Sequence, residues 1–109
     1  MAKIRLGDFK SAAGILIDNL GDPTLKPTAK IDLMEWIADC HSKAEDEVEA
    51  AKWFERAGKS WLESKDLSAL ERRTKALSDF SRAVEASKRG NDLEGIRRAT
   101  RLKTSLNPN

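Results

Sequence analysis

His41 and Cys40 are the only histidine and the only cysteine in the chain, and they are adjacent. Consecutive side chains of a helix point about 100° apart, so these two groups would not face a common site. A histidine dyad would need other partners, and a single cysteine excludes an internal disulfide and a zinc site built on several thiolates. We therefore expect His41 to be a packed or half-buried residue at a turn.

Four carboxylates lie close together near the middle of the chain, at Glu45, Asp46, Glu47 and Glu49. Their order lacks the spacing and the glycine of a calcium-binding loop, so a solvated helix start is the favoured interpretation. The sequence also has no glycine-rich phosphate loop and no serine nucleophile motif. We predict a protein that is not an enzyme, with no catalytic residue, no cofactor and no bound metal.

The chain has no tyrosine but three tryptophans, which contribute a large apolar area: Trp36, Trp53 and Trp61. Trp53 and Trp61 are eight residues apart, which places them on the same face of a helix. Core packing is one interpretation of this pair. A partly exposed anchor for a partner protein is the other, because tryptophan is enriched at binding hot spots. Trp53 and Trp61 are therefore the aromatic candidates for partner binding.

A basic cluster near the C-terminus is the best polar candidate for function. It consists of Arg97, Arg98, Arg101 and Lys103, with Lys88 and Arg89 nearby. Cations complement the dipole at a helix end and promote solubility, which is one interpretation. Docking of an acidic protein or a nucleic acid is the sharper hypothesis, with Arg97, Arg98 and Arg101 as the contact residues.

Charge is divided unevenly between the two halves of the chain. Residues 1–50 carry six Lys and Arg against ten Asp and Glu, whereas residues 51–109 carry fourteen against eight. The formal net charge is only +2, so the whole chain has no strong nucleic-acid signature. The folded molecule should therefore be electrically polar along its length.

Composition indicates one folded domain over residues 1–109. Hydrophobic residues make up 39% and charged residues 35%, which is too apolar for a disordered chain and too charged for a membrane protein. No apolar run approaches the roughly 18 residues of a spanning helix, and the N-terminus lacks the apolar centre of a signal peptide. We expect a soluble, cytoplasmic domain with no membrane partner.

Apolar residues recur at the three-to-four spacing of amphipathic helices in five stretches. The stretches begin near Asp8, Thr28, Glu45, Ser68 and Asn91, and each ends at the next turn or capping signal. No glycine or proline lies between residues 28 and 57, so one long rod is an alternative to a break at residues 42–46.

Capping patterns mark several of the expected helix ends. Ser42 with Glu45, and Ser68 with Glu71, have the three-residue spacing of a capping box. Gly90 follows two cations and is a residue that tolerates positive φ, as expected just after a helix end. These patterns predict boundaries between the second and third helices, before the fourth helix and after it.

Residues 29–62 contain a fuller pattern of small and apolar side chains. The spacings match those of the tetratricopeptide repeat (TPR), a helix-turn-helix unit of about 34 residues, at Ile37, Ala38, His41, Ala50, Phe54 and Ala57. This segment therefore resembles one such repeat. It departs from the family at Met34, where tryptophan is favoured, and at Leu62, where proline is favoured.

The five stretches predict an all-α fold of about five helices, and the resemblance implies that they form antiparallel helical hairpins wound into a TPR-like right-handed superhelix. An irregular helical bundle is the alternative. The family's usual role implies a non-catalytic adaptor or scaffold that binds a partner protein or peptide. Residues 8–20 resemble the second helix of a preceding unit, and a homo-oligomer would cover its unpaired face. The alternative function is nucleic-acid binding by the basic C-terminal helix.

Overall fold

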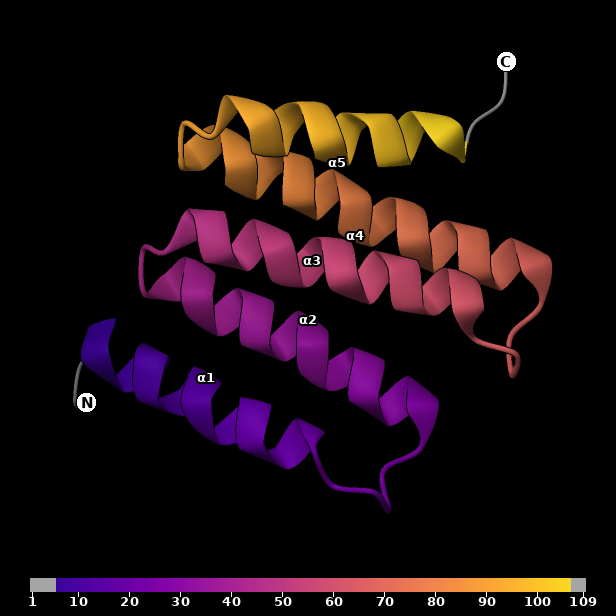
Figure 1. The fold of residues 1–109 in the computed structure, drawn as a ribbon, viewed down its shortest axis with the longest axis horizontal. Helices are drawn as coiled ribbons and strands as arrows, with labels where there is room; N and C mark the ends of the chain where they lie inside the picture. Colours follow the sequence, from indigo (N-terminus) through magenta and orange to yellow (C-terminus); the bar gives the residue numbers. More distant parts are fainter. Residues whose placement is uncertain (1–5, 107–109) are drawn as a thin grey trace.

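Five α-helices follow one another in the computed structural model, which describes residues 6–106, and no strand lies within that range. The helices are α1 (Leu6–Leu20), α2 (Pro27–Lys43), α3 (Glu47–Glu63), α4 (Ala69–Arg89) and α5 (Leu93–Ser105). Consecutive helices are antiparallel and are stacked in chain order from α1 to α5 (Figure 1). The predicted all-α fold of antiparallel helical hairpins is confirmed.

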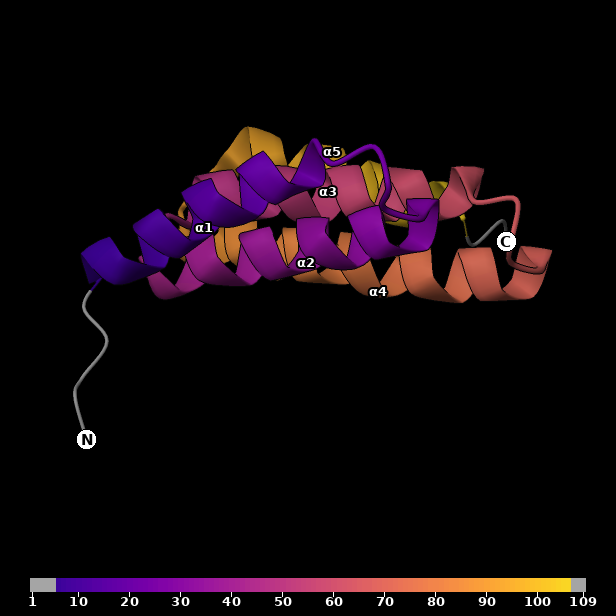
Figure 2. The same ribbon diagram turned by 90° about the horizontal axis from the view of Figure 1, so that it is seen from below.

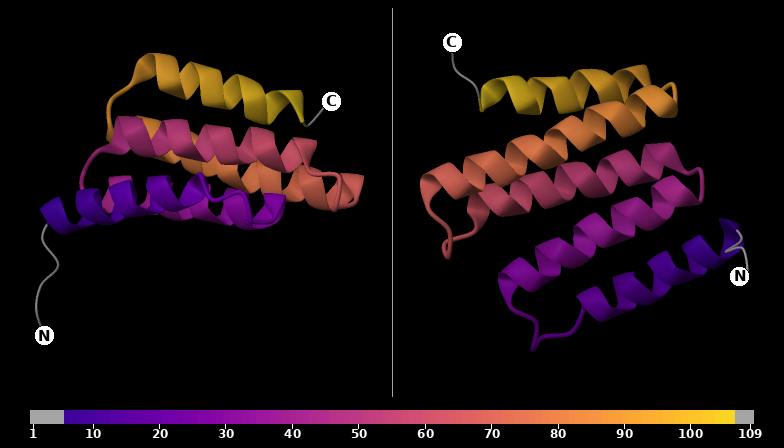
Figure 3. Two further views of the ribbon diagram at one scale, coloured as in Figure 1. Left: turned by 60° about the horizontal axis from the view of Figure 1, so that its bottom comes forward. Right: turned by 180° about the vertical axis from the view of Figure 1, so that it is seen from behind.

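The helices alternate between two layers. Seen from below, α1, α3 and α5 form one layer, and α2 and α4 form the other (Figure 2). Helix α3 lies at the centre and packs against α2, α4 and α5, whereas α1 packs mainly on α2. Two further views show α1 and α5 at opposite edges of the array (Figure 3). The acidic and basic halves of the sequence therefore lie toward opposite edges.

The turn between α2 and α3 shows that this segment forms a hairpin and not a single rod. Glu45 has a left-handed φ of 62°. Its N–H donates to the Ser42 carbonyl at 3.0 Å, and the Asp46 N–H donates to the His41 carbonyl at 2.8 Å. These two bonds form a Schellman motif. The expected Ser42–Glu45 capping box is wrong, because Glu45 belongs to the turn and the Ser42 hydroxyl donates to Glu47 at 2.9 Å.

The turn between α4 and α5 repeats this geometry. Asn91 has a φ of 55°, whereas Gly90 has a φ of −85°, so the left-handed residue is one position later than the glycine. The Asn91 N–H donates to the Lys88 carbonyl at 3.1 Å, and the Asp92 N–H donates to the Ser87 carbonyl at 2.9 Å. Glu45 and Asn91 therefore occupy equivalent positions in two hairpins that end their first helix in the same way.

Small side chains allow neighbouring helices to approach closely. The core contains alanines of all five helices that are fully or almost fully buried, among them Ala13, Ala38, Ala50, Ala57, Ala76, Ala83 and Ala99. The capping box at the start of α4 is confirmed: the Ser68 hydroxyl accepts from the Glu71 N–H at 3.2 Å, and the Glu71 carboxylate accepts from the Ser68 N–H at 3.3 Å. The local patterns therefore place the helices, and the small residues set their separation.

Candidate functional site

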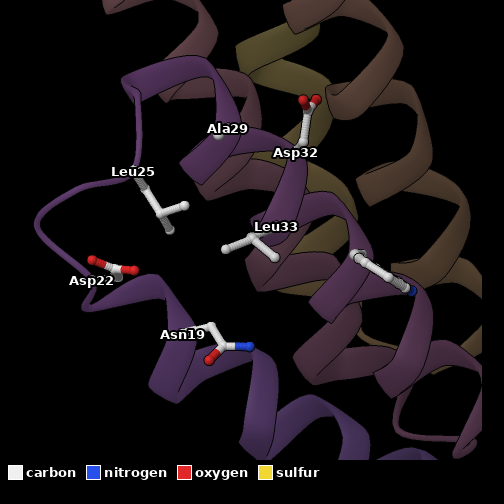
Figure 4. Close-up of a pocket in the computed structure, with 7 residues that line it drawn as sticks. Asn19, Asp22, Leu25, Ala29, Asp32 and Leu33 are labelled. Carbon is white, nitrogen blue, oxygen red and sulfur yellow. The ribbon is translucent and has the colours of Figure 1, made fainter.

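A groove runs between α1 and α2, with Trp36 at its middle. Trp36 lines two hollows of about 400 Å³ and about 430 Å³. The hollow beside the α1–α2 loop is also lined by Asn19, Asp22, Leu25, Ala29, Asp32 and Leu33 (Figure 4). The hollow toward the start of α1 is also lined by Asp8, Phe9, Ala12, Asp39, Cys40 and Lys43. We call the two hollows together the α1–α2 groove.

Helical spacing explains the apolar floor of the groove. On α2 the lining residues Ala29, Leu33, Trp36 and Cys40 follow one another at intervals of four, three and four, which places them on one face of the helix. Leu25 comes from the preceding loop and points toward Leu33 (Figure 4). The loop and two helices therefore enclose an elongated apolar surface.

Trp36 is the most distinctive residue of this surface, because 60% of it is exposed. Tryptophan carries a large apolar area that is normally covered, and a contiguous exposed apolar patch marks an interaction site. Ile15 of α1, Leu70 of α4 and Leu93 of α5 are also exposed. None of these three lines either hollow of the groove, so Trp36 is the stronger candidate for a binding anchor.

Carboxylates flank the apolar floor. Asp32 and Asp39 are exposed and lie one turn before and one turn after Trp36 on α2. At the loop end, Asp22 Oδ1 accepts hydrogen bonds from the Thr24 N–H at 2.9 Å and from the Thr24 hydroxyl at 2.7 Å. These bonds lower the pKa of Asp22, so its carboxylate keeps its charge.

Among the described residues that line the groove, Lys43 is the one cation, and it lies at the end opposite Asp22. The ammonium group of Lys43 lies 5.8 Å from the centroid of the Phe9 ring. This distance is within the range of a cation–π contact, which links the end of α2 to the start of α1. Lys43 therefore interacts with the floor of the groove, while the flanking side chains are predominantly acidic.

Trp61, one of the predicted partner-binding residues, lies in the core with 3% of its surface exposed. Its indole Nε1 donates to Asp79 Oδ2 at 3.0 Å and to Glu35 Oε2 at 3.1 Å. Asp79 is fully buried, and burial together with the neighbouring Glu35 carboxyl raises the pKa of Asp79 to about 8. Trp61 therefore joins α2, α3 and α4, as the core-packing interpretation expects.

Trp53, the other predicted aromatic residue, is half-buried and packs against the core. The Arg56 guanidinium lies 4.8 Å from the centroid of its ring. The structure thus leaves Trp36 far more accessible than either predicted tryptophan. One expectation from the sequence indicated the region around α1, because the first helix was expected to lack a partner helix on one side.

The three predicted arginines of α5 have different surroundings. Arg98 Nε donates to both oxygens of Glu55 at 2.9 Å, and Glu55 is 6% exposed. This hydrogen bonding raises the pKa of Arg98. Arg97 and Arg101 are exposed and line a hollow of about 290 Å³ together with Glu94 and Arg98. Arg98 thus connects α5 to α3, while Arg97 and Arg101 face solvent.

His41 and Cys40 lie at the end of α2 in different surroundings. His41 is half-buried, and its Nδ1 is 3.9 Å from Asp46 Oδ2. Cys40 is buried beneath the α1–α2 groove, and desolvation raises the pKa of its thiol, so the thiol is neutral at pH 7. Within residues 6–106, no three His, Cys, Asp or Glu side chains are grouped so that they could hold a metal ion.

No family model, curated protein or solved structure matches this chain significantly. None of the five described helices combines the length and the apolar character needed to cross a membrane. The shape and charge of the α1–α2 groove are therefore the basis on which a function can be proposed.

Proposed function

We propose that this chain is a non-catalytic protein-interaction module that binds a helical segment of a partner protein in the α1–α2 groove. The observation that carries the proposal is Trp36, which is 60% exposed between two adjoining hollows. A tryptophan buries about 150–250 Å² when it is covered, so burying the exposed part would contribute about 3 kcal/mol to binding at about 25 cal/mol per Å². This magnitude is typical of a binding hot spot.

We further propose that the module is TPR-like, a cytoplasmic adaptor or scaffold whose helices form a right-handed superhelix. Two observations support this proposal. The residues expected to be small or apolar in the repeat, Ile37, Ala38 and Ala50, are fully buried. The α2–α3 and α4–α5 hairpins also contain the same turn, with Glu45 and Asn91 in the left-handed conformation.

A photocrosslinking experiment tests the proposed groove. In the chain of residues 1–109, Trp36 is replaced by p-benzoylphenylalanine, which keeps an aromatic group at this position. The protein is produced in cells of the organism from which the sequence comes. Lys65, exposed between α3 and α4, is replaced in the control. We expect a discrete adduct with another protein from position 36 and none from position 65. No adduct at position 36, or the same adducts at both positions, would contradict the proposal.

Nucleic-acid binding by α5 is the second candidate function, because Arg97 and Arg101 are exposed and lie one turn apart. Glu94 in the same hollow and the Glu55–Arg98 ion pair reduce the positive charge available there. A mobility shift with DNA or RNA that weakens steeply with salt and disappears in Arg97→Glu/Arg101→Glu would favour this candidate. A salt-independent result, or no shift, would reject it.

A further inference from the structure

We infer that the occupant of the α1–α2 groove is a basic amphipathic helix of another protein, whose Lys or Arg side chains pair with Asp32 and Asp39 on either side of Trp36. The inference rests on the proposed function and adds the chemistry of the partner. Three features carry it: the length of the groove, the placement of its charges and the absence of a matching surface within residues 6–106 of this chain.

The length and shape of the groove suit a helix of about four turns. The lining of α2 extends from Ala29 to Lys43, which corresponds to about 21 Å at about 1.5 Å per residue. Its floor is apolar along this length, with Leu33, Trp36 and Cys40 in succession. A groove of this kind binds the apolar stripe of an amphipathic helix, formed by residues at i, i+3 or i+4, and i+7.

The charged side chains of the described lining are four carboxylates, Asp8, Asp22, Asp32 and Asp39, and one ammonium, Lys43. Lys43 is at one end, where it interacts with the Phe9 ring, whereas Asp32 and Asp39 flank the centre. A helix with basic side chains beside its apolar stripe would complement this pattern, and one with acidic side chains would be repelled.

The register of the carboxylates makes the expectation specific. Asp32 and Asp39 are seven residues apart, or about 10 Å along α2, and Trp36 lies between them. A partner helix aligned with α2 would meet both carboxylates with basic residues at i and i+7. The exposed indole of Trp36 would also accept a cation–π contact from an arginine of the partner.

A second copy of this chain is a poorer occupant than another protein. Its basic helix, α5, carries Arg97 and Arg101 on its exposed face. However, Leu93 is the single large apolar residue of α5 that is strongly exposed within residues 6–106, at 70%. One leucine at the start of the helix does not provide the repeated apolar stripe that would fill a groove about four turns long. The exposed isoleucines of α1, Ile15 at 62% and Ile17 at 39%, are two residues apart, which is not the three-to-four spacing of such a stripe, and α1 has no excess of basic residues.

The experiment uses a display library of 18-residue helical peptides with a constant leucine stripe and with Lys, Arg, Glu or Gln varied at the flanking positions. The library is selected on the full chain and, in parallel, on Trp36→Ala. We expect enrichment of Lys or Arg at two positions seven residues apart, on the wild-type chain alone.

The dissociation constant of an enriched, fluorescein-labelled peptide should increase at least tenfold in Asp32→Asn/Asp39→Asn and should rise with salt. Asp66→Asn, in the α3–α4 loop, is the matched control and should bind as the wild type does.

The outcomes separate the inference from the proposed function. Enrichment of acidic or uncharged flanks that still requires Trp36 would overturn the basic partner and leave the groove as the binding site. No enrichment above the Trp36→Ala background would overturn both. A concentration-dependent dimer in sedimentation that Trp36→Ala dissociates would assign the groove to a second copy and overturn the inference. Circular dichroism of each variant checks that the helices are retained.

Discussion

Gly58 of α3 lies so close to Phe80 of α4 that a Cβ atom at position 58 would stand 2.5 Å from Cε1 of the ring. Phe80 is fully buried, so its ring has no free space into which to move. The missing side chain of Gly58 therefore sets how closely the two central helices approach.

Gly58→Ala should lower the free energy of unfolding by about 1–2 kcal/mol. Overpacking a core costs about 1–3 kcal/mol, which exceeds the gain of up to about 1 kcal/mol from helix propensity. The measurement is urea denaturation followed by circular dichroism. Gly14→Ala in α1 is the matched control: nothing lies within 4 Å of the added Cβ, so it should stabilise by about 0.5–1 kcal/mol. A stabilised Gly58→Ala variant would contradict this packing.

Glu45→Gly should raise the free energy of unfolding by about 0.5–1 kcal/mol. Glu45 has a φ of 62°, and the left-handed conformation costs a non-glycine residue about 1–2 kcal/mol, part of which the greater chain entropy of glycine offsets. Asn91→Gly should change stability less, because asparagine tolerates the φ of 55° at the equivalent position. Thermal and urea unfolding of the two variants measure the difference. A destabilised Glu45→Gly variant would count against the turn described for α2–α3.

The titration of Asp79 should lower the free energy of unfolding as the pH rises from about 4 to about 8. Burial and the Glu35 carboxyl raise the pKa of Asp79 to about 8 in the folded protein, from an ordinary value of 3.8, although Arg82 opposes the shift. In this pH interval the folded state therefore binds more protons at Asp79 than the unfolded chain does. The contribution of Asp79 to the free energy of unfolding falls as the pH increases.

Asp79→Asn removes this titration while keeping an acceptor for the Trp61 indole. Urea unfolding of both proteins at several pH values between about 4 and 8.5 measures the effect. We expect the free energy of unfolding of the wild type to fall relative to that of Asp79→Asn as the pH rises. Parallel curves for the two proteins would show that Asp79 titrates as an ordinary carboxylate.

Arg98→Ala should destabilise the protein by about 1.5–3 kcal/mol, because it leaves the Glu55 carboxylate, 6% exposed, without its ionic partner. Arg101→Ala, one turn away and exposed, should change stability by less than about 0.5 kcal/mol. A double-mutant cycle with Glu55→Gln isolates the pairwise energy. Equal effects of Arg98→Ala and Arg101→Ala would contradict a structural role for the Arg98–Glu55 pair.

Much of the fold could be predicted from local patterns. The apolar spacing placed all five helices, and the Ser68–Glu71 spacing predicted a capping box that the structure contains. The small residues of the repeat-like segment, Ala38, Ala50 and Ala57, are fully buried as expected. These features depend on residues within one or two helical turns of each other, so the sequence carries them directly.

The remaining features depended on tertiary structure. Local sequence patterns permitted one long helix through residue 45. In the structure, α3 instead packs beside α2, and Glu45 between them has a left-handed conformation. Periodicity gave Trp53 and Trp61 a common face, but the neighbouring helices bury Trp61 and leave Trp36 exposed. Spacing reports the direction of a side chain around its own helix and contains no information on what lies opposite. The exposed groove and the Glu55–Arg98 ion pair were therefore decided only when the five helices packed together.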